Sequence, residues 1–535
     1  MSDSTSNPAQ QPTRPGGQSG YLSHRQVLVV MGGLMSGLFL AALDQTIVAT
    51  ALPRITSDLG GLDKLSWVVT TYLLTSTAST PLWGKLSDLY GRRLIFQAAI
   101  GIFVLGSLLT GAAQSMGELI AFRAVQGLGG GGLIALAMAT IGDIVPPRER
   151  GRYSGYMGAV FGLSSVVGPL LGGWFADGPG WRWIFFINVP IGIAALAVTS
   201  VALKIPHVRR EHSIDYPGAA AIVAGVSSLL LFVAWNGPER GWLSGTSLLL
   251  VALGLACVLA FVWIESRASE PIIPLALFRN SVFSTANLYA FLMGLAMFGS
   301  IVFIPLYLQV VDGMSPTESG LGLIPLVMGI LTTVTGSGQL MTKTGRYKVF
   351  PILGASIVVA AMFLLSRLGT DTPYWYAGLS MYLMGAGLGL GMQVILTAVQ
   401  NAVPHEHMGT ASSSVIFFRQ MGGAFGTALF GAILSTRLAH HLADTLPAGQ
   451  APTGDMTNSA DAIEALPEPI HGIVVDGFAD SLNDVFLSAV PVAAVALLAS
   501  LFIKEIRLRS RYDGQGGGSS AESADEPEAA RTPAT

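Results

Sequence analysis

Charged residues are scarce in this 535-residue chain. Asp, Glu, Lys and Arg together make up only 11% of it, against about 25% in an average soluble domain. So few charges could not cover the surface of a soluble protein of this size, which excludes a large water-soluble fold. A single cysteine, Cys257, excludes a disulfide within the chain.

Motifs of enzymes and of nucleotide-driven machines are also missing. The chain has no G-x-x-x-x-G-K-[ST] phosphate loop, so we expect no use of ATP. The run Gly127–Gly132 matches G-x-G-x-x-G by letters, but it lies in an apolar segment, where small residues favour close helix contact. No Cys/His metal spacing and no catalytic constellation is visible. We therefore expect neither an enzyme nor a bound cofactor or metal, and no nucleic-acid partner.

Long apolar segments are what the chain has in abundance, and hydrophobic residues make up 51% of it. Fourteen segments come near the ~20 residues that a helix needs to cross a bilayer. They predict an all-α integral membrane protein that crosses the bilayer many times. The predicted spans are 27–53, 64–83, 94–113, 118–142, 153–176, 182–204, 217–236, 246–266, 283–309, 318–341, 349–367, 374–400, 409–437 and 482–504.

The distribution of basic residues predicts the orientation. Most of the 29 Lys and Arg residues fall in the tails and in alternate connections, and the connection 438–481 contains none. Because cytoplasmic connections carry an excess of Lys and Arg, both termini are predicted to be cytoplasmic. The frequent Gly and Ala are compatible with a bacterial source, and we expect the protein in the cytoplasmic (inner) membrane of a bacterium.

An internal repeat divides the chain into two parts. The segment Gly84–Arg92 is echoed by Gly338–Arg346. Two six-helix halves plus two inserted helices account for the fourteen spans, and such halves are typical of a transporter whose site lies between them. The predicted organisation is a disordered tail at 1–24, a first half at 25–210, two inserted helices at 211–270, a second half at 271–509 with an outer loop at 438–481, and a disordered tail at 510–535.

Asp44 is the only carboxylate deep inside a predicted span. A charge at this depth costs roughly 2.5–3.5 kcal/mol on insertion scales, which marks it as a candidate functional residue. Burial favours the neutral form of a carboxyl group, so Asp44 is a candidate for proton uptake near neutral pH. The alternative is a structural aspartate that is hydrogen-bonded to Thr46 or to a neighbouring helix.

Two further spans carry polar residues at membrane depth. Arg123 is followed by Gln126 in the fourth span, and an arginine there needs a partner or a water-filled cavity. A purely structural arginine bonded to backbone carbonyls is the alternative. In the thirteenth span, Arg419 and Gln420 either contact substrate or secure helix packing.

Glycine-containing motifs mark two more places. One is the sequence GKLSDLYGRR between the second and third spans, where glycines permit a tight turn. The other is the fifth span, where small residues at helical spacing allow close helix contact and a proline bends the helix. The residues that matter here are Gly84, Asp88, Gly91, Arg92 and Arg93 in the first motif, and Gly158, Gly162, Gly168, Pro169 and Gly172 in the second.

Together these motifs resemble the major facilitator superfamily, specifically its fourteen-helix drug/proton antiporters, over about residues 27–505. The resemblance implies that Asp88 and Arg92 form a conformational latch with Asp143 at the inner end of the fourth span. We expect a one-sided latch, because the second copy has Thr342 in place of the aspartate. The alternative is that its basic residues only fix topology. The segment Trp181–Pro190, typical of the fourteen-helix group, is expected to be structural, with aromatics at the outer interface.

The resemblance also implies a function. It predicts alternating-access export of amphipathic drugs, antibiotics or dyes, driven by the proton gradient, with Asp44 as the proton or substrate site and Arg123 assisting proton transfer. Lipophilic cations or neutral drugs are the expected cargo. The fifth-span pattern resembles that of exporters, although simple packing would also explain it. The alternatives are an exporter dedicated to one host metabolite, antibiotic or lipid, an importer, and a non-transporting membrane receptor or scaffold.

Overall fold

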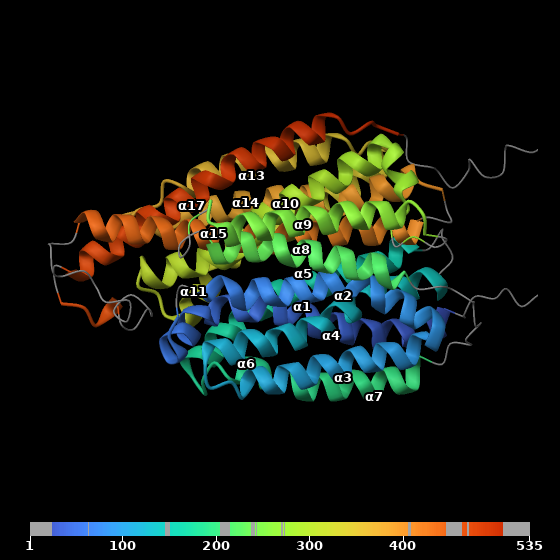
Figure 1. Cartoon of the computed structure of the whole chain (residues 1–535), viewed down its shortest axis with the longest axis horizontal. Helices are drawn as coiled ribbons and strands as arrows, with labels where there is room; N and C mark the ends of the chain where they lie inside the picture. The colour runs from blue at the N-terminus through green and yellow to red at the C-terminus, as the bar shows by residue number, and fades with distance from the viewer. Residues whose placement is uncertain are drawn as a thin grey trace, which may run out of the picture.

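The computed structural model is all-helical in the part of the chain that it describes (Figure 1). Every predicted span falls on a helix, and two of the spans fall on a pair of consecutive helices. The described residues are 24–61, 64–144, 150–203, 215–236, 241, 243–268, 271, 273–404, 408–445, 463–467 and 470–506. The predicted tails fall almost wholly outside these ranges.

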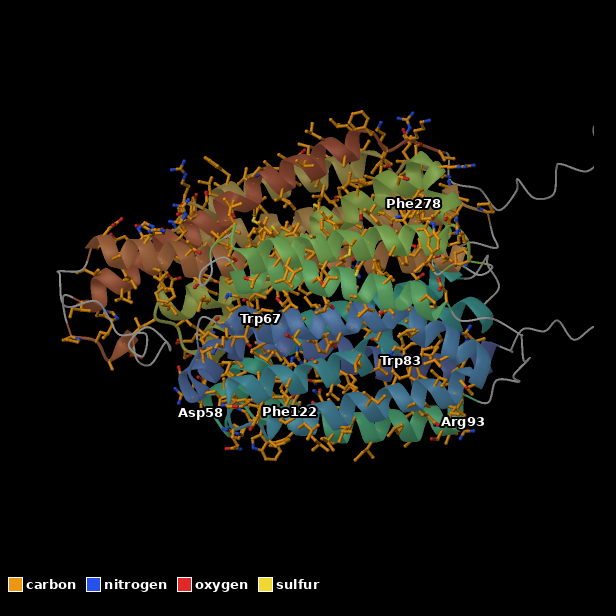
Figure 2. The ribbon with its side chains drawn as sticks, viewed as in Figure 1. Asp58, Trp67, Trp83, Arg93, Phe122 and Phe278 are labelled. Carbon is orange, nitrogen blue, oxygen red and sulfur yellow. The ribbon has the colours of Figure 1, made fainter. Side chains whose placement is uncertain are left out.

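The first bundle contains the helices up to residue 202. Within it α4 packs against α2 and α3, while α1 packs against α5 and α7. Figure 2 shows Asp58 and Arg93 at opposite ends of this bundle. Its helices are α1 (His24–Leu59), α2 (Leu65–Tyr90), α3 (Arg92–Gly111), α4 (Met116–Ile144), α5 (Arg150–Asp177), α6 (Trp183–Phe186) and α7 (Asn188–Ala202).

The second bundle is formed by the helices after residue 280. Here α10 packs against α15 and α17, and α14 packs against α12 and α13. Figure 1 shows it beside the first bundle, with the helix axes running roughly in the same direction. Its helices are α10 (Ser281–Val310), α11 (Pro316–Gly322), α12 (Ile324–Thr344), α13 (Val349–Leu365), α14 (Tyr374–Ala402), α15 (Met408–Thr445) and α17 (Ile470–Leu501).

Two further helices, α8 (Tyr216–Asn236) and α9 (Gly245–Glu265), form a hairpin between the two bundles in sequence. α8 contacts α2 of the first bundle and α15 of the second, whereas α9 packs mainly on α8. α9 is therefore the more peripheral helix of the pair. A short 3₁₀ helix, η2 (Leu275–Arg279), leads into α10.

Length and composition agree with a membrane protein. Within the described residues, nine helices are long and apolar enough to cross a bilayer, and two shorter helical segments, Pro217–Val233 and Val349–Leu365, are also apolar. The interior is closely packed: a Cβ on Gly131 of α4 would collide with the Ser76 carbonyl of α2, so only glycine permits this approach. The two helices share one of the main interfaces of the first bundle.

The range predicted as the outer loop 438–481 is partly helical. α15 continues to Thr445 and α17 begins at Ile470, so helix occupies both ends of that range. Hydropathy marks where a segment leaves the lipid, but a helix can continue into water on polar residues such as His440 and His441. The helix ends therefore lie beyond the apolar segments.

Candidate functional site

A buried ion pair joins α1 and α4 in the first bundle. Arg123 Nη1 donates to Asp44 Oδ2 at 2.6 Å, and both side chains are almost completely excluded from solvent. The two charges compensate one another, so neither is left unpaired in the apolar interior. The structure thus supplies the partner that each residue needs at this depth, and Asp44 is not the isolated carboxylate that the sequence suggested.

Two side-chain amides complete the surroundings of the carboxylate. Gln126 Nε2 donates to Asp44 Oδ1 at 2.8 Å, and Asn188 Nδ2 donates to the same oxygen at 3.2 Å. The Ser107 hydroxyl accepts from both amides, at 3.0 Å from Gln126 and 2.9 Å from Asn188, and itself donates to the Phe185 carbonyl at 2.9 Å. Both carboxylate oxygens of Asp44 therefore accept hydrogen bonds from N–H donors.

The guanidinium of Arg123 is held from several directions. It donates to Gln126 Oε1 at 2.9 Å and to the Val68 carbonyl at 3.3 Å. Its Cζ atom lies 4.2 Å from the centre of the Tyr72 ring, a cation–π distance. Gln126, Val68 and Tyr72 thus hold the guanidinium in addition to Asp44.

Helix α5 approaches this site from the other side of α1. Gly168 and Gly172 lie against Thr46 and Ile47 with no space for a Cβ atom, and the Thr46 hydroxyl donates to the Ser164 carbonyl at 2.9 Å. A side chain at either glycine would push α5 away from the turn that follows Asp44. The side-chain surroundings of Gly158 and Gly162 lie outside the described residues.

The C-terminal part of α5 also reaches the second bundle. Gly320 of α11 lies against the Pro169 carbonyl, and the Asp177 carboxylate accepts from the Thr317 backbone N–H at 2.8 Å. A second contact between the bundles is Gln309 Nε2, which donates to the Thr50 carbonyl at 2.8 Å. These contacts join the two bundles at the end of the molecule where α10 is connected to α11.

The predicted latch is only partly visible. Gly91 has a φ of 90°, a conformation that favours glycine, and forms the turn between α2 and α3. Arg92 donates to the Ser87 hydroxyl, and Arg93 is exposed. The side chains of Gly84, Asp88 and Asp143 lie outside the described set, so the latch stays a prediction.

The polar pair on α15 does not join the Asp44 site. Gln420 Oε1 accepts from the Thr77 hydroxyl of α2 at 3.4 Å, a contact between the two bundles. Arg419 has no hydrogen bond or ion pair among the described residues, and its side chain is only partly exposed. Gln420 therefore belongs to the interface between the bundles, whereas the Arg419 backbone lies against Gly294 of α10 within the second bundle.

Sequence reasoning missed Ser107 and did not single out Asn188. Ser107 is one hydroxyl among many in an apolar segment, and nothing in the sequence distinguishes it. Asn188 belongs to the segment Trp181–Pro190, for which a structural role with aromatics at the outer interface was predicted. Trp181 is in fact buried and donates to Asp58 at 2.9 Å, whereas Trp183 is half exposed.

Comparison with known proteins agrees with this fold. The family model "Major Facilitator Superfamily" matches residues 34–427, and the chain belongs to this superfamily. It is 37% identical to the multidrug transporter protein MdtP of Bacillus subtilis, over 92% of this chain and 96% of that protein. It is 40% identical to an uncharacterized MFS-type transporter of Mycobacterium tuberculosis, over 91% of this chain and 70% of that protein.

Solved structures show the same fold at low sequence identity. A bacterial homologue of the human lysosomal transporter Spinster superposes with a TM-score of 0.63 at 17% identity, covering 90% of this chain and 98% of that chain. A D-xylose–proton symporter superposes with a TM-score of 0.57 at 14% identity, covering 89% and 97%. The protein is thus a multi-pass membrane transporter of small molecules and not an enzyme.

Proposed function

We propose that the protein is a proton-coupled antiporter that exports amphipathic drugs or dyes across the cytoplasmic membrane of a bacterium. The observation that carries the proposal is the buried pair of Asp44 and Arg123. A carboxylate held this deep by one charged partner has two distinct states, ion-paired and protonated. The relationship to a protein named as a multidrug transporter supports drugs as cargo.

The proposed cycle couples the state of Asp44 to the arrangement of the bundles. Proton uptake from outside neutralises Asp44 and removes its attraction for Arg123, which loosens α1 from α4. Because α5 packs on α1 and reaches α11, a shift of α1 is passed to the contacts between the bundles. Release of the proton inward restores the ion pair, and the substrate leaves in exchange. The proposed cargo is a lipophilic cation or a neutral drug. The proposed topology has fourteen transmembrane helices with both termini in the cytoplasm. The proton gradient is the only proposed energy source.

Everted membrane vesicles with an imposed proton gradient and a fluorescent lipophilic cation test this proposal. Wild type is expected to accumulate the dye only with the gradient, and Asp44→Asn is expected to lose this uptake. Asp480→Asn makes the same chemical change at an exposed position on α17 and serves as the matched control. Gradient-dependent uptake that survives in well-expressed Asp44→Asn would refute the role of Asp44. If several unrelated dyes fail to be transported by folded wild type, an exporter of one cargo becomes the better description.

A further inference from the structure

Two side-chain amides flank the Asp44 carboxylate, and they differ in the hydrogen bonding of their oxygen atoms. Gln126 and Asn188 each place an NH₂ group between Asp44 Oδ1 and Ser107 Oγ. The Gln126 oxygen is held by Arg123 at 2.9 Å. The Asn188 oxygen is buried and has no hydrogen-bond partner among the described residues. A buried amide oxygen without a donor is uncommon and calls for an explanation.

A protonated Asp44 needs something that the present arrangement lacks. When the carboxyl carries a proton it becomes a donor and requires an acceptor. Gln126 cannot turn its oxygen toward Asp44 without giving up Arg123, whereas Asn188 loses no bond to its oxygen by turning. After a half-turn of the amide, the Asn188 oxygen would occupy the place of its nitrogen, beside Asp44 Oδ1 and the Ser107 hydroxyl.

We propose that Asn188 is a positioning residue that follows the proton on Asp44. With Asp44 ionised, its NH₂ group donates to the carboxylate; with Asp44 protonated, its oxygen accepts the carboxyl proton. The turn gives up the bond from Asn188 to Ser107, while the bond from the protonated Asp44 to the Asn188 oxygen replaces the one to the carboxylate. The inference rests on the proposed function for its meaning in transport, but the turn itself is a property of the proton-binding equilibrium.

The charged and titratable groups that face Asp44 are few. In the described part of the chain they are Arg123 from α4 and the Tyr72 phenol from α2, while α3 and α7 contribute the neutral Ser107 and Asn188. Arg123 does not lose its proton in this range, and a phenol titrates far above neutral pH. The proposal therefore assigns the proton to Asp44.

Infrared difference spectra of the purified full-length protein, recorded as the pH is lowered, test the proposal without any transport. We expect a carboxyl band that Asp44→Asn abolishes, together with a side-chain amide C=O band that moves to lower wavenumber as the oxygen gains a hydrogen bond. Isotope-labelled asparagine should shift that amide band in the wild type. Asn188→Leu should remove it, and Gln97→Leu, which breaks a 2.7 Å bond to Ser200 between α3 and α7, should not.

The pH dependence of dye export gives an independent readout. A hydrogen bond to a charged group is about twice as strong as one between neutral groups, so Asn188→Leu should disfavour the carboxylate more than the acid. In Asn188→Leu the midpoint of the pH profile should rise by about one pH unit, which corresponds to about tenfold tighter proton binding. Gln97→Leu should not change the midpoint.

Specific results would overturn the inference. They are an Asp44-dependent carboxyl band without an asparagine signal, an amide band that survives in Asn188→Leu, or no Asp44-dependent band at all. If Asn188→Leu does not fold, the labelled wild type still decides. A wild type that shows both bands but no gradient-driven export would refute the proposed function and leave the Asn188 inference standing.

Discussion

Replacing Asp44 and Arg123 separately and together tests whether they form a compensated pair. In Asp44→Asn, Arg123 keeps its bonds to Gln126 and Val68 but has no counter-charge, and a guanidinium cannot lose its proton. Removing one partner of a buried pair typically costs about 3–5 kcal/mol. We expect a destabilisation of this size for Asp44→Asn, with little dependence on pH.

Arg123→Gln should behave differently, because Asp44 can escape its charge by taking up a proton. The folded variant then holds a proton that the unfolded chain releases, so its stability rises as the pH falls. In the double variant neither charge remains, and the loss should be clearly smaller than the sum of the two single losses.

Melting midpoints in detergent, at mildly acidic and mildly alkaline pH, provide the comparison. The expected pattern is a pH-independent loss for Asp44→Asn, a loss for Arg123→Gln that shrinks in acid, and partial rescue in the double variant. Losses that add up in the double variant would refute the pairing argument. So would an equal pH response from the two single variants, because only one of them retains a group that can titrate.

Three further predictions concern packing, contacts between the bundles, and pH. Gly172→Ala should lower the free energy of unfolding by about 1–3 kcal/mol and slow transport, because the added methyl group would collide with α1. Gly101 faces open space, so Gly101→Ala should change the free energy of unfolding by no more than about 0.5 kcal/mol in the same melting assay. Gln309→Leu removes the side-chain donor from the buried Thr50 carbonyl and should weaken this contact between the bundles. A cysteine introduced between the bundles, on the side of the α10–α11 connection, should then react more with a thiol reagent. Unchanged labelling would contradict this. Burial raises the pKa of the Asp312 carboxyl, which lies between α10 and α11, so the ionised carboxylate destabilises the folded state above that pKa. Asp312→Asn should therefore raise the melting midpoint at neutral pH. The increase should vanish in acid, where the wild-type carboxyl is neutral.

Hydropathy and charge placement were enough to locate the helices. Each predicted span lies on a helix because crossing a bilayer requires a long apolar run, which is visible in the sequence. The C-terminal end of α15 and the N-terminal end of α17 extend beyond the predicted spans, because a helix can continue past an apolar segment on polar residues. The sequence carries no comparable signal for such an end.

The candidate site was predicted residue by residue but not as an assembly. Asp44 and Arg123 stood out because charges are rare at membrane depth. Their pairing across 79 positions depends on which faces of α1 and α4 meet, and no sequence motif records this. Ser107 and Asn188 are neutral, so burial in an apolar span did not mark them as unusual.

The position of α8 has a consequence for the two seams between the bundles. α8 lies across the seam where α2 meets α15, and Figure 1 shows it between the two bundles with α9 beside it. On that flank the bilayer meets a helical hairpin instead of an open seam. The opposite seam, where α5 meets α11 and α12, has no such cover from α8 and α9. In the described part of the chain the two seams between the bundles therefore differ, because the hairpin covers the one at α2 and α15, whereas direct contacts of α5 with α11 close the other.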